Sequence, residues 1–159
     1  MKKILTVVIA LLPFVNAADA PQLKEGLWSI HTQTIENPGN KKTETTISLC
    51  RDHAYDTHAN AIAKGVKGCT TLSESSTAGK RSVNMRCVIG GTTIETKSTT
   101  TIDGDTSFHS ETHTTYTPAM INTNESTMIV DQKYTGACRA GMNPGDRIDA
   151  SGRVINGRR

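Results

Sequence analysis

The stretch that decides the fold is TTIETKSTTTIDGDTSFHSETHTTYT, residues 92–117. Threonine and other β-branched residues dominate both halves, and such residues favour a half-solvated strand. Asp103-Gly104-Asp105 separates the halves and is typical of a tight turn. The stretch therefore predicts two antiparallel strands, 92–102 and 106–117, joined by a three-residue loop.

The loop sets the pairing of the two strands. With Asp103–Asp105 as the loop, the large apolar side chains, including Ile94 and Phe108, all fall on one face. Lys97 then lies opposite Glu111 on the other face, where opposite charges attract across the strands. We expect a thin apolar core on one side of this hairpin.

The same pattern recurs along the chain, which contains 24 threonines. Turn signals such as Pro38-Gly39-Asn40 and Gly90-Gly91 separate the threonine-rich segments. The fold class is therefore mainly β, an antiparallel meander that forms a curved sheet or a partly open barrel. The expected strands are 27–35, 44–50, 69–75, 82–89, 92–102, 106–117 and 126–136.

One short α-helix is expected at about 53–64. Asp52 is suited to the N-cap, and Gly65 ends the segment. Tyr55, Ala59 and Ile62 recur at helical spacing, which predicts an apolar stripe that packs on the sheet.

The first 17 residues have the pattern of a secretory signal peptide. Lys2 and Lys3 precede an apolar run at 4–15, and Val15-Asn16-Ala17 is suited to cleavage near Ala17. Twelve helical residues span only ~18 Å, less than a ~30 Å bilayer core, so no membrane span is expected after cleavage. The expected parts are the signal peptide (1–17), one disulfide-stapled β-rich domain (18–138) and a Gly/Arg-rich C-terminal tail (139–159), in a periplasmic or secreted protein.

The charge of the chain argues against nucleic acid as a partner. The formal net charge is +3, and two of the lysines lie in the leader. Five arginines lie in 139–159, so the remaining body is close to neutral and carries no basic patch. We expect the basic tail to be solvated and poorly ordered.

All four cysteines, Cys50, Cys69, Cys87 and Cys138, follow the leader. An even number in an exported chain predicts two disulfides. Cys69 and Cys87 are symmetric about Ala78 in a hairpin, which favours Cys69–Cys87 with Cys50–Cys138, although Leu72 then needs a bulge. The alternative, Cys50–Cys69 with Cys87–Cys138, stays open.

Several motifs together resemble a known family. They are Lys24-Glu25-Gly26-Leu27-Trp28, Cys50-Arg51-Asp52, Gly68-Cys69, the 133–138 segment ending in Cys138, and Gly141-Met142-Asn143-Pro144-Gly145-Asp146. The pattern resembles the DUF3617 family of exported bacterial proteins of unknown function, over nearly all of 21–157. The resemblance implies a periplasmic or secreted β-rich domain of a Gram-negative bacterium, and it implies no activity.

No catalytic residue, metal ligand or cofactor-binding residue is assigned, and we do not expect an enzyme. His109 and His113 lie four residues apart on one strand, ~13 Å, too far to share one ion. His53 and His58, five apart, do not stack on one helix face. The chain also contains no Gly-x-Ser-x-Gly motif.

Three functional hypotheses follow. The favoured one is a non-catalytic envelope domain that binds a protein or polymer through its threonine-rich sheet. The second is a small apolar-ligand carrier with a lipocalin-like cavity, and the third is an undetected hydrolase. The residues expected to line such a cavity are Trp28, Ile30, Met85, Phe108 and Met128.

Overall fold

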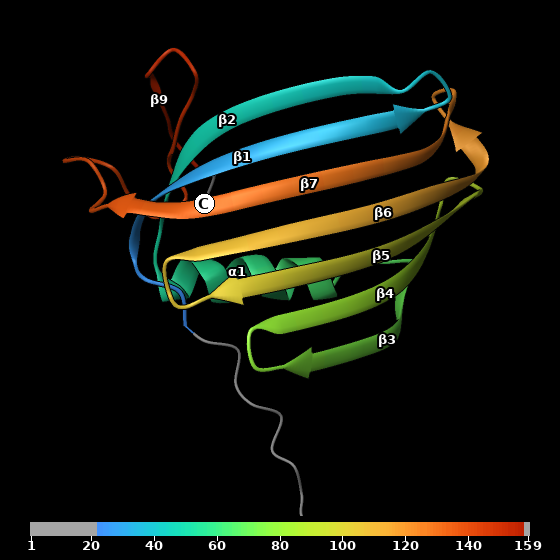
Figure 1. The fold of residues 1–159 in the computed structure, drawn as a ribbon, viewed down its shortest axis with the longest axis horizontal. Helices are drawn as coiled ribbons and strands as arrows, with labels where there is room; N and C mark the ends of the chain where they lie inside the picture. Colours follow the sequence, from blue (N-terminus) through green and yellow to red (C-terminus); the bar gives the residue numbers. More distant parts are fainter. Residues whose placement is uncertain (1–21, 158–159) are drawn as a thin grey trace, which may run out of the picture.

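The computed structural model describes residues 22–157, apart from the side chains of 63 and 64, so the predicted leader lies outside the described residues. This part forms one helix and one nine-stranded antiparallel sheet (Figure 1). The elements are β1 (Gly26–Asn37), β2 (Lys41–Arg51), α1 (His53–Lys64), β3 (Cys69–Thr77), β4 (Lys80–Ile89), β5 (Thr92–Asp103), β6 (Ser107–Met120), β7 (Thr123–Gly136), β8 (Arg147–Ile148) and β9 (Val154–Ile155).

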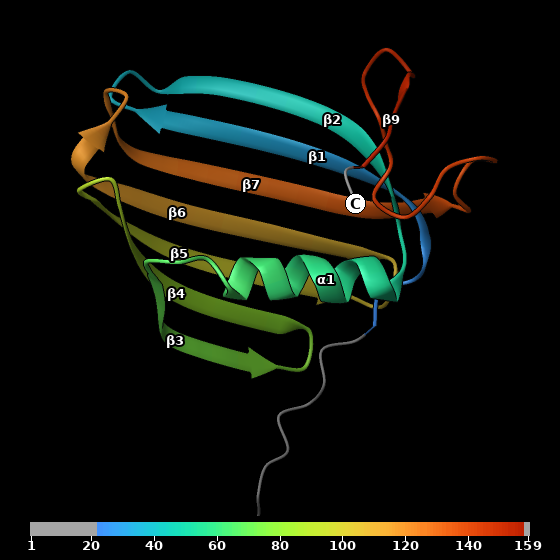
Figure 2. The same cartoon turned by 180° about the vertical axis from the view of Figure 1, so that it is seen from behind.

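The strand order across the sheet is β3-β4-β5-β6-β7-β1-β2-β8-β9. The sheet has two free edges and is therefore open, which confirms the expected mainly β class with one short helix. After the β1–β2 hairpin, α1 carries the chain to the far edge, and the β3–β7 meander returns beside β1. The helix lies along one face of the sheet (Figure 2), which we call the helix-side face; the opposite face is the outer face.

The predicted pairing of the 92–117 hairpin is wrong by two residues. Ile94 lies opposite Tyr116, and Lys97 lies opposite His113 instead of Glu111. The loop is Gly104–Thr106, one residue later than expected, and Gly104 begins it with a φ of +61°. Glycine adopts this left-handed conformation without the steric penalty of a Cβ atom. A shift of two residues keeps every side chain on its predicted face, so the apolar face itself is unchanged.

The structure joins Cys69 to Cys87 and Cys50 to Cys138, the pairing favoured from the sequence. Cys69 lies directly opposite Cys87 in the β3–β4 hairpin. The register of that hairpin shifts at Leu72, where the bulge was expected, yet Leu72 remains 59% exposed. The longer bridge ties the end of β2 to the segment that follows β7.

The apolar core is small and lies at one end of the sheet. Trp28 is completely buried, and its ring packs against Phe108 and Tyr134 at centroid distances of 6.2 and 6.1 Å. Its indole Nε1 donates a hydrogen bond to the Lys24 carbonyl at 2.8 Å. Leu49 lies opposite Trp28 on β2 and is also buried. Most of the remaining helix-side face lacks a dense apolar filling.

The expectation of a poorly ordered tail is wrong for residues 139–157. Ile148 in β8 pairs with β2 and is 4% exposed. Backbone bonds link Cys50 to Gly145 and Asp146, at 2.7 and 2.9 Å. The Asp146 carboxylate accepts from the backbone N–H groups of Asn143 and Gly157, both at 2.8 Å. The segment therefore folds as part of the domain.

The helix forms as predicted, but its apolar stripe does not pack on the sheet. The Asp52 carboxylate accepts from the Tyr55 backbone N–H at 2.7 Å, which caps α1. Ile62 is 60% exposed and lines a 510 Å³ cavity against the C-terminal segment, together with Pro144. Arg51 of the sheet instead binds Asp56. This ion pair turns a polar side of the helix toward the sheet.

Candidate functional site

Three neighbouring cavities lie between α1 and the helix-side face of the sheet. Their volumes are 480, 390 and 210 Å³, and Asn60 lines all three. Arg81 and Thr100 line the two larger cavities, while Arg51 and Phe108 line the second and third. We call these three cavities, which share lining residues, the helix groove. The two larger cavities fall in the size range of small-molecule sites.

Strand alternation builds the floor of the helix groove. Met85 and Val83 lie two residues apart on β4, so both side chains point to the helix-side face. Ile102 and Phe108 lie opposite each other on β5 and β6 and extend this floor. Hydroxyl groups lie between the apolar side chains, and Thr100 bonds to Ser110 across the strands at 3.1 Å. The floor is thus mixed, because most of the lining side chains are polar and the apolar ones form two small patches among them.

Arg51 is the central charged residue of the site. Its Nη2 lies 2.7 Å from Asp56 Oδ1, its Nε donates to the same oxygen at 2.8 Å, and its Nη1 donates to Gln132 at 3.0 Å. The guanidinium carbon lies 5.1 Å from the centroid of the Trp28 ring, within cation–π range. The Arg51 and Asp56 side chains are only 11% and 20% exposed. This residue therefore connects the helix, the sheet and the core.

Arg81 and Glu74 form the second ion pair of the groove. The two residues come from β4 and β3, and Arg81 Nη2 lies 2.8 Å from Glu74 Oε1. Their side chains are 36% and 44% exposed, so the pair lies at the open rim. Both line the largest cavity.

The third polar contact of the site involves His53 at the start of α1. Its Nδ1 lies 3.2 Å from Glu25 Oε1, and its Nε2 lies 3.0 Å from the Leu23 carbonyl. The side chain of Asn60, in contrast, makes no hydrogen bond with the rest of the described chain. Asn60 is exposed and borders all three cavities, and its carboxamide offers both a donor and an acceptor to a ligand in the groove.

The structure brings together only part of the predicted cavity lining. Met85 and Phe108 line the helix groove. Trp28 lies in the closed core below Arg51 instead, because its ring is covered on all sides. Ile30 and Met128 border none of the three groove cavities, and Met128 is 40% exposed.

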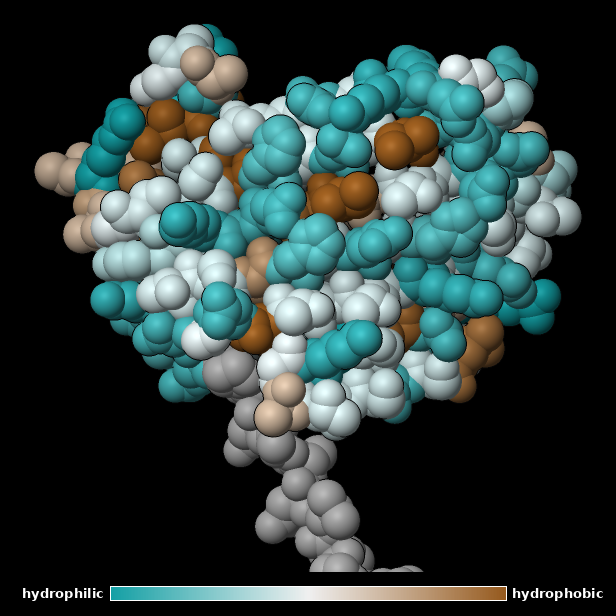
Figure 3. Space-filling view, in the orientation of Figure 1, coloured by the Kyte–Doolittle hydropathy of each residue, from teal (hydrophilic) through white to brown (hydrophobic). Residues whose placement is uncertain are grey.

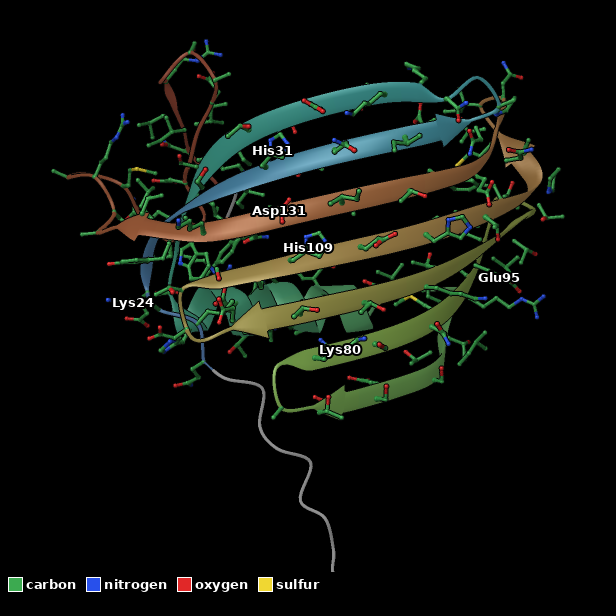
Figure 4. The ribbon with its side chains drawn as sticks, in the orientation of Figure 1. Lys24, His31, Lys80, Glu95, His109 and Asp131 are labelled. Carbon is green, nitrogen blue, oxygen red and sulfur yellow. A yellow bond between two sulfur atoms is a disulfide. The ribbon has the colours of Figure 1, made fainter. Side chains whose placement is uncertain are left out.

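Two of the outer-face histidines each pair with one carboxylate, whereas His31 Nδ1 lies 3.0 Å from the Thr46 hydroxyl. His109 Nδ1 lies 2.7 Å from Asp131, and His113 Nε2 lies 2.9 Å from Glu125. His31, Asp131 and His109 occupy facing positions on β1, β7 and β6 (Figure 4). Across residues 22–157, no group of three His, Cys, Asp or Glu side chains is arranged to hold a metal ion.

The outer face of the sheet is mostly polar across its surface. Figure 3 shows mostly hydrophilic side chains with separate, small apolar spots. A 360 Å³ depression on this face is bordered by hydroxyl, imidazole and charged groups, including His31, His109 and Asp131.

Two carboxyl groups far from the helix groove have a lowered pKa. The Lys42 ammonium lowers the pKa of Glu44, and a hydrogen bond from Ser151 lowers that of Asp149.

Sequence reasoning missed the polar residues of the groove, above all Arg51, Asn60 and Arg81. They come from β2, α1 and β4, and each alone has the pattern of a solvated surface residue. The one available signal was Asp56, which lies between the apolar stripe positions of the helix and close to Arg51 in sequence. An arginine five residues before an aspartate across a helix cap is too common to identify a site.

Comparisons with known proteins identify a family and no activity. Searches of the curated proteins and of the solved structures each found no match. Within residues 22–157, no helix has the length and apolar character that crossing a membrane requires. The family model titled "Protein of unknown function (DUF3617)" matches residues 23–138, so the Gly-rich ending that was expected to share the resemblance lies beyond the match. Because the matched segment covers most of the 159 residues, the chain belongs to the DUF3617 family.

Proposed function

We propose that this protein is an exported, non-catalytic binding domain that holds a small molecule in the helix groove. The observation that carries the proposal is the adjacency of the 480 and 390 Å³ cavities, which share the lining residues Asn60, Arg81 and Thr100. Polar groups that converge beside apolar side chains in a cavity of this size are a feature of small-molecule sites. Of the three hypotheses drawn from the sequence, the small-ligand carrier therefore has the strongest support. The proposed site is a groove with many polar groups, and it differs in this from the lipocalin-like apolar cavity expected from the sequence.

The polar contacts of the groove support binding over catalysis. Ser98 and Thr100 bond to Thr112 and Ser110, at 3.0 and 3.1 Å, and neither bonds to a histidine. A serine or threonine nucleophile needs a general base within hydrogen-bond reach. His53 is occupied by Glu25 and the Leu23 carbonyl.

The proposal includes export to the periplasm after cleavage near Ala17. Lys2, Lys3 and the apolar run at 4–15 support this, as do the two disulfides. Disulfides persist in oxidising compartments, and a small apolar core benefits from them.

The test is binding of a neutral apolar dye, Nile red, to protein purified from the periplasm. We expect saturable fluorescence enhancement that Asn60→Phe abolishes, because a phenyl ring at this position fills the junction of the three cavities. Ala61→Phe is the matched control, since Ala61 is exposed on the same helix and borders none of the groove cavities. Equal binding by both variants, with the Trp28 emission of the wild type in each, would refute the groove as the site.

Binding of a protein or polymer through the outer face is the second candidate. Its support is the exposed polar surface around the 360 Å³ depression. Native mass spectrometry of the periplasmic protein separates the two candidates. A macromolecular partner that is retained by Asn60→Phe would favour the outer face, whereas a small bound mass that this variant loses would favour the groove.

A further inference from the structure

We infer, given that the helix groove binds a small molecule, that its ligand is an uncharged amphiphile with a hydroxyl, ester or amide group. The first ground is the charge balance of the groove. Arg51 pairs with Asp56 at 2.7 Å, and Arg81 pairs with Glu74 at 2.8 Å. His53, the remaining titratable side chain of basic character in the lining, pairs with Glu25 at 3.2 Å.

A charged ligand finds no vacant counter-charge in this arrangement. The lining carries two formal positive and two formal negative charges in the arginine–carboxylate pairs, each within contact of its opposite. A carboxylate or phosphate headgroup would have to displace Glu74 or Asp56 from its arginine, and a cationic headgroup would have to displace the arginine. Leaving Arg51 or Asp56 without its partner is unfavourable because both are mostly buried, whereas the more exposed Arg81–Glu74 pair opposes a charged headgroup less strongly.

The floor of the groove offers apolar contacts to part of a ligand. Val83 with Met85, and Ile102 with Phe108, form two apolar patches of the groove surface below α1, with Arg81 and Thr100 between them. Transfer of an alkyl chain from water onto this surface is favourable because apolar area on both partners leaves water.

Asn60 supplies the polar contact. It borders all three cavities, and its carboxamide has no hydrogen-bond partner elsewhere in the described chain. A hydroxyl or amide group can both donate to and accept from a carboxamide, and an ester can accept from it, without introducing charge. The combination of a neutral hydrogen-bonding group and an alkyl chain is that of a neutral amphiphile such as a monoacylglycerol.

The experiment compares three probes that share one lauryl chain: monolauroylglycerol, laurate and lauryltrimethylammonium, each below its micelle concentration. Their affinities are measured by displacement of Nile red from the full mature protein. We expect monolauroylglycerol to bind at least about tenfold more tightly than either charged probe. Asn60→Leu, which keeps the side-chain volume similar, should weaken monolauroylglycerol about tenfold.

A charge variant tests the reasoning directly. Glu74→Gln leaves Arg81 without its carboxylate, so the ratio of laurate affinity to monolauroylglycerol affinity should rise at least about fivefold. Glu44→Gln is the matched control, because Glu44 pairs with Lys42 on the outer face at 2.9 Å, and it should leave the ratio unchanged.

The outcomes separate the two proposals. If Nile red and all three probes fail to bind the folded protein, the proposed function fails and this inference fails with it. If laurate or lauryltrimethylammonium binds as tightly as monolauroylglycerol, or if Glu74→Gln does not move the ratio, the groove remains a binding site and the uncharged ligand class is wrong.

Discussion

Replacing Arg51 by methionine tests how the helix is held over the sheet. The substitution removes the contacts to Asp56 at 2.7 and 2.8 Å and the bond to Gln132 at 3.0 Å. It also removes a guanidinium that lies 5.1 Å from the Trp28 ring and 5.9 Å from the Phe108 ring. Methionine keeps much of the side-chain volume, so the change isolates the charge and its hydrogen bonds.

The expected loss of unfolding free energy follows from the burial of the Arg51–Asp56 ion pair. Breaking a fully buried ion pair costs about 3–5 kcal/mol, because it leaves one charge unpaired. Asp56 is 20% exposed and can partly hydrate, which places the expected loss near the low end, at about 3 kcal/mol. For a domain of this size, such a loss lowers the melting temperature by roughly 10 °C.

The assay is urea unfolding followed by the emission of Trp28, the one tryptophan of the chain. Arg153→Met is the control, because Arg153 pairs with Asp149 at 3.2 Å while its own side chain is 76% exposed, and it should leave the midpoint unchanged. The double variant Arg51→Met, Asp56→Asn should recover part of the loss, since no charge is then left unpaired. Equal effects of Arg51→Met and Arg153→Met would refute the account of the helix anchor.

Three further predictions concern the disulfides and the C-terminal segment. The unreduced, denatured periplasmic protein should take up no alkylating reagent, and labelling of two or more cysteines would contradict the two bridges. Replacing Cys50 and Cys138 by alanine should lower the free energy of unfolding by about 4–5 kcal/mol, and replacing Cys69 and Cys87 should lower it by about 3 kcal/mol. The difference arises because the bridges close loops with sequence separations of 88 and 18. Calorimetry that finds the reverse order would exclude loop entropy as the main cause of the stabilisation. Ile148→Ala should cost about 2–4 kcal/mol in urea unfolding while Val154→Ala, at an exposed site, changes little, and equal values would show that β8 does not pack on β2.

The sequence predicted the strands well because their signals are local. Threonine-rich alternation and glycine turns place the seven long strands within a few residues of their observed ends. The pairing of β5 with β6 was less accurate for a physical reason. Side chains alternate with a period of two, so a shift of two residues leaves the same residues on each face, and face patterns cannot detect it. The observed loop places Gly104, with a φ of +61°, at its first position.

The C-terminal segment escaped prediction because its structural content is small. β8 has two residues, and Ile148 is the one buried apolar side chain in it. Two residues show no alternation, and the surrounding glycines and arginines have the composition of a solvated tail. Its order depends on backbone bonds to Cys50 and on the Asp146 carboxylate, which are contacts at long range in the sequence.

The helix groove exists because the helix is anchored by polar contacts at one end instead of by apolar packing along its length. The Asp52 cap, the Arg51–Asp56 pair and the contact of His53 with Glu25 all lie at the N-terminal half of α1. The apolar residue that would close the gap further along, Ile62, points to the C-terminal segment. Turning the apolar stripe onto the sheet would fill the cavities, but it would separate Arg51 from Asp56. The same contact that stabilises the helix therefore keeps the groove open, and a ligand that binds in the groove of the folded domain alone should raise its stability with the logarithm of the ligand concentration above Kd.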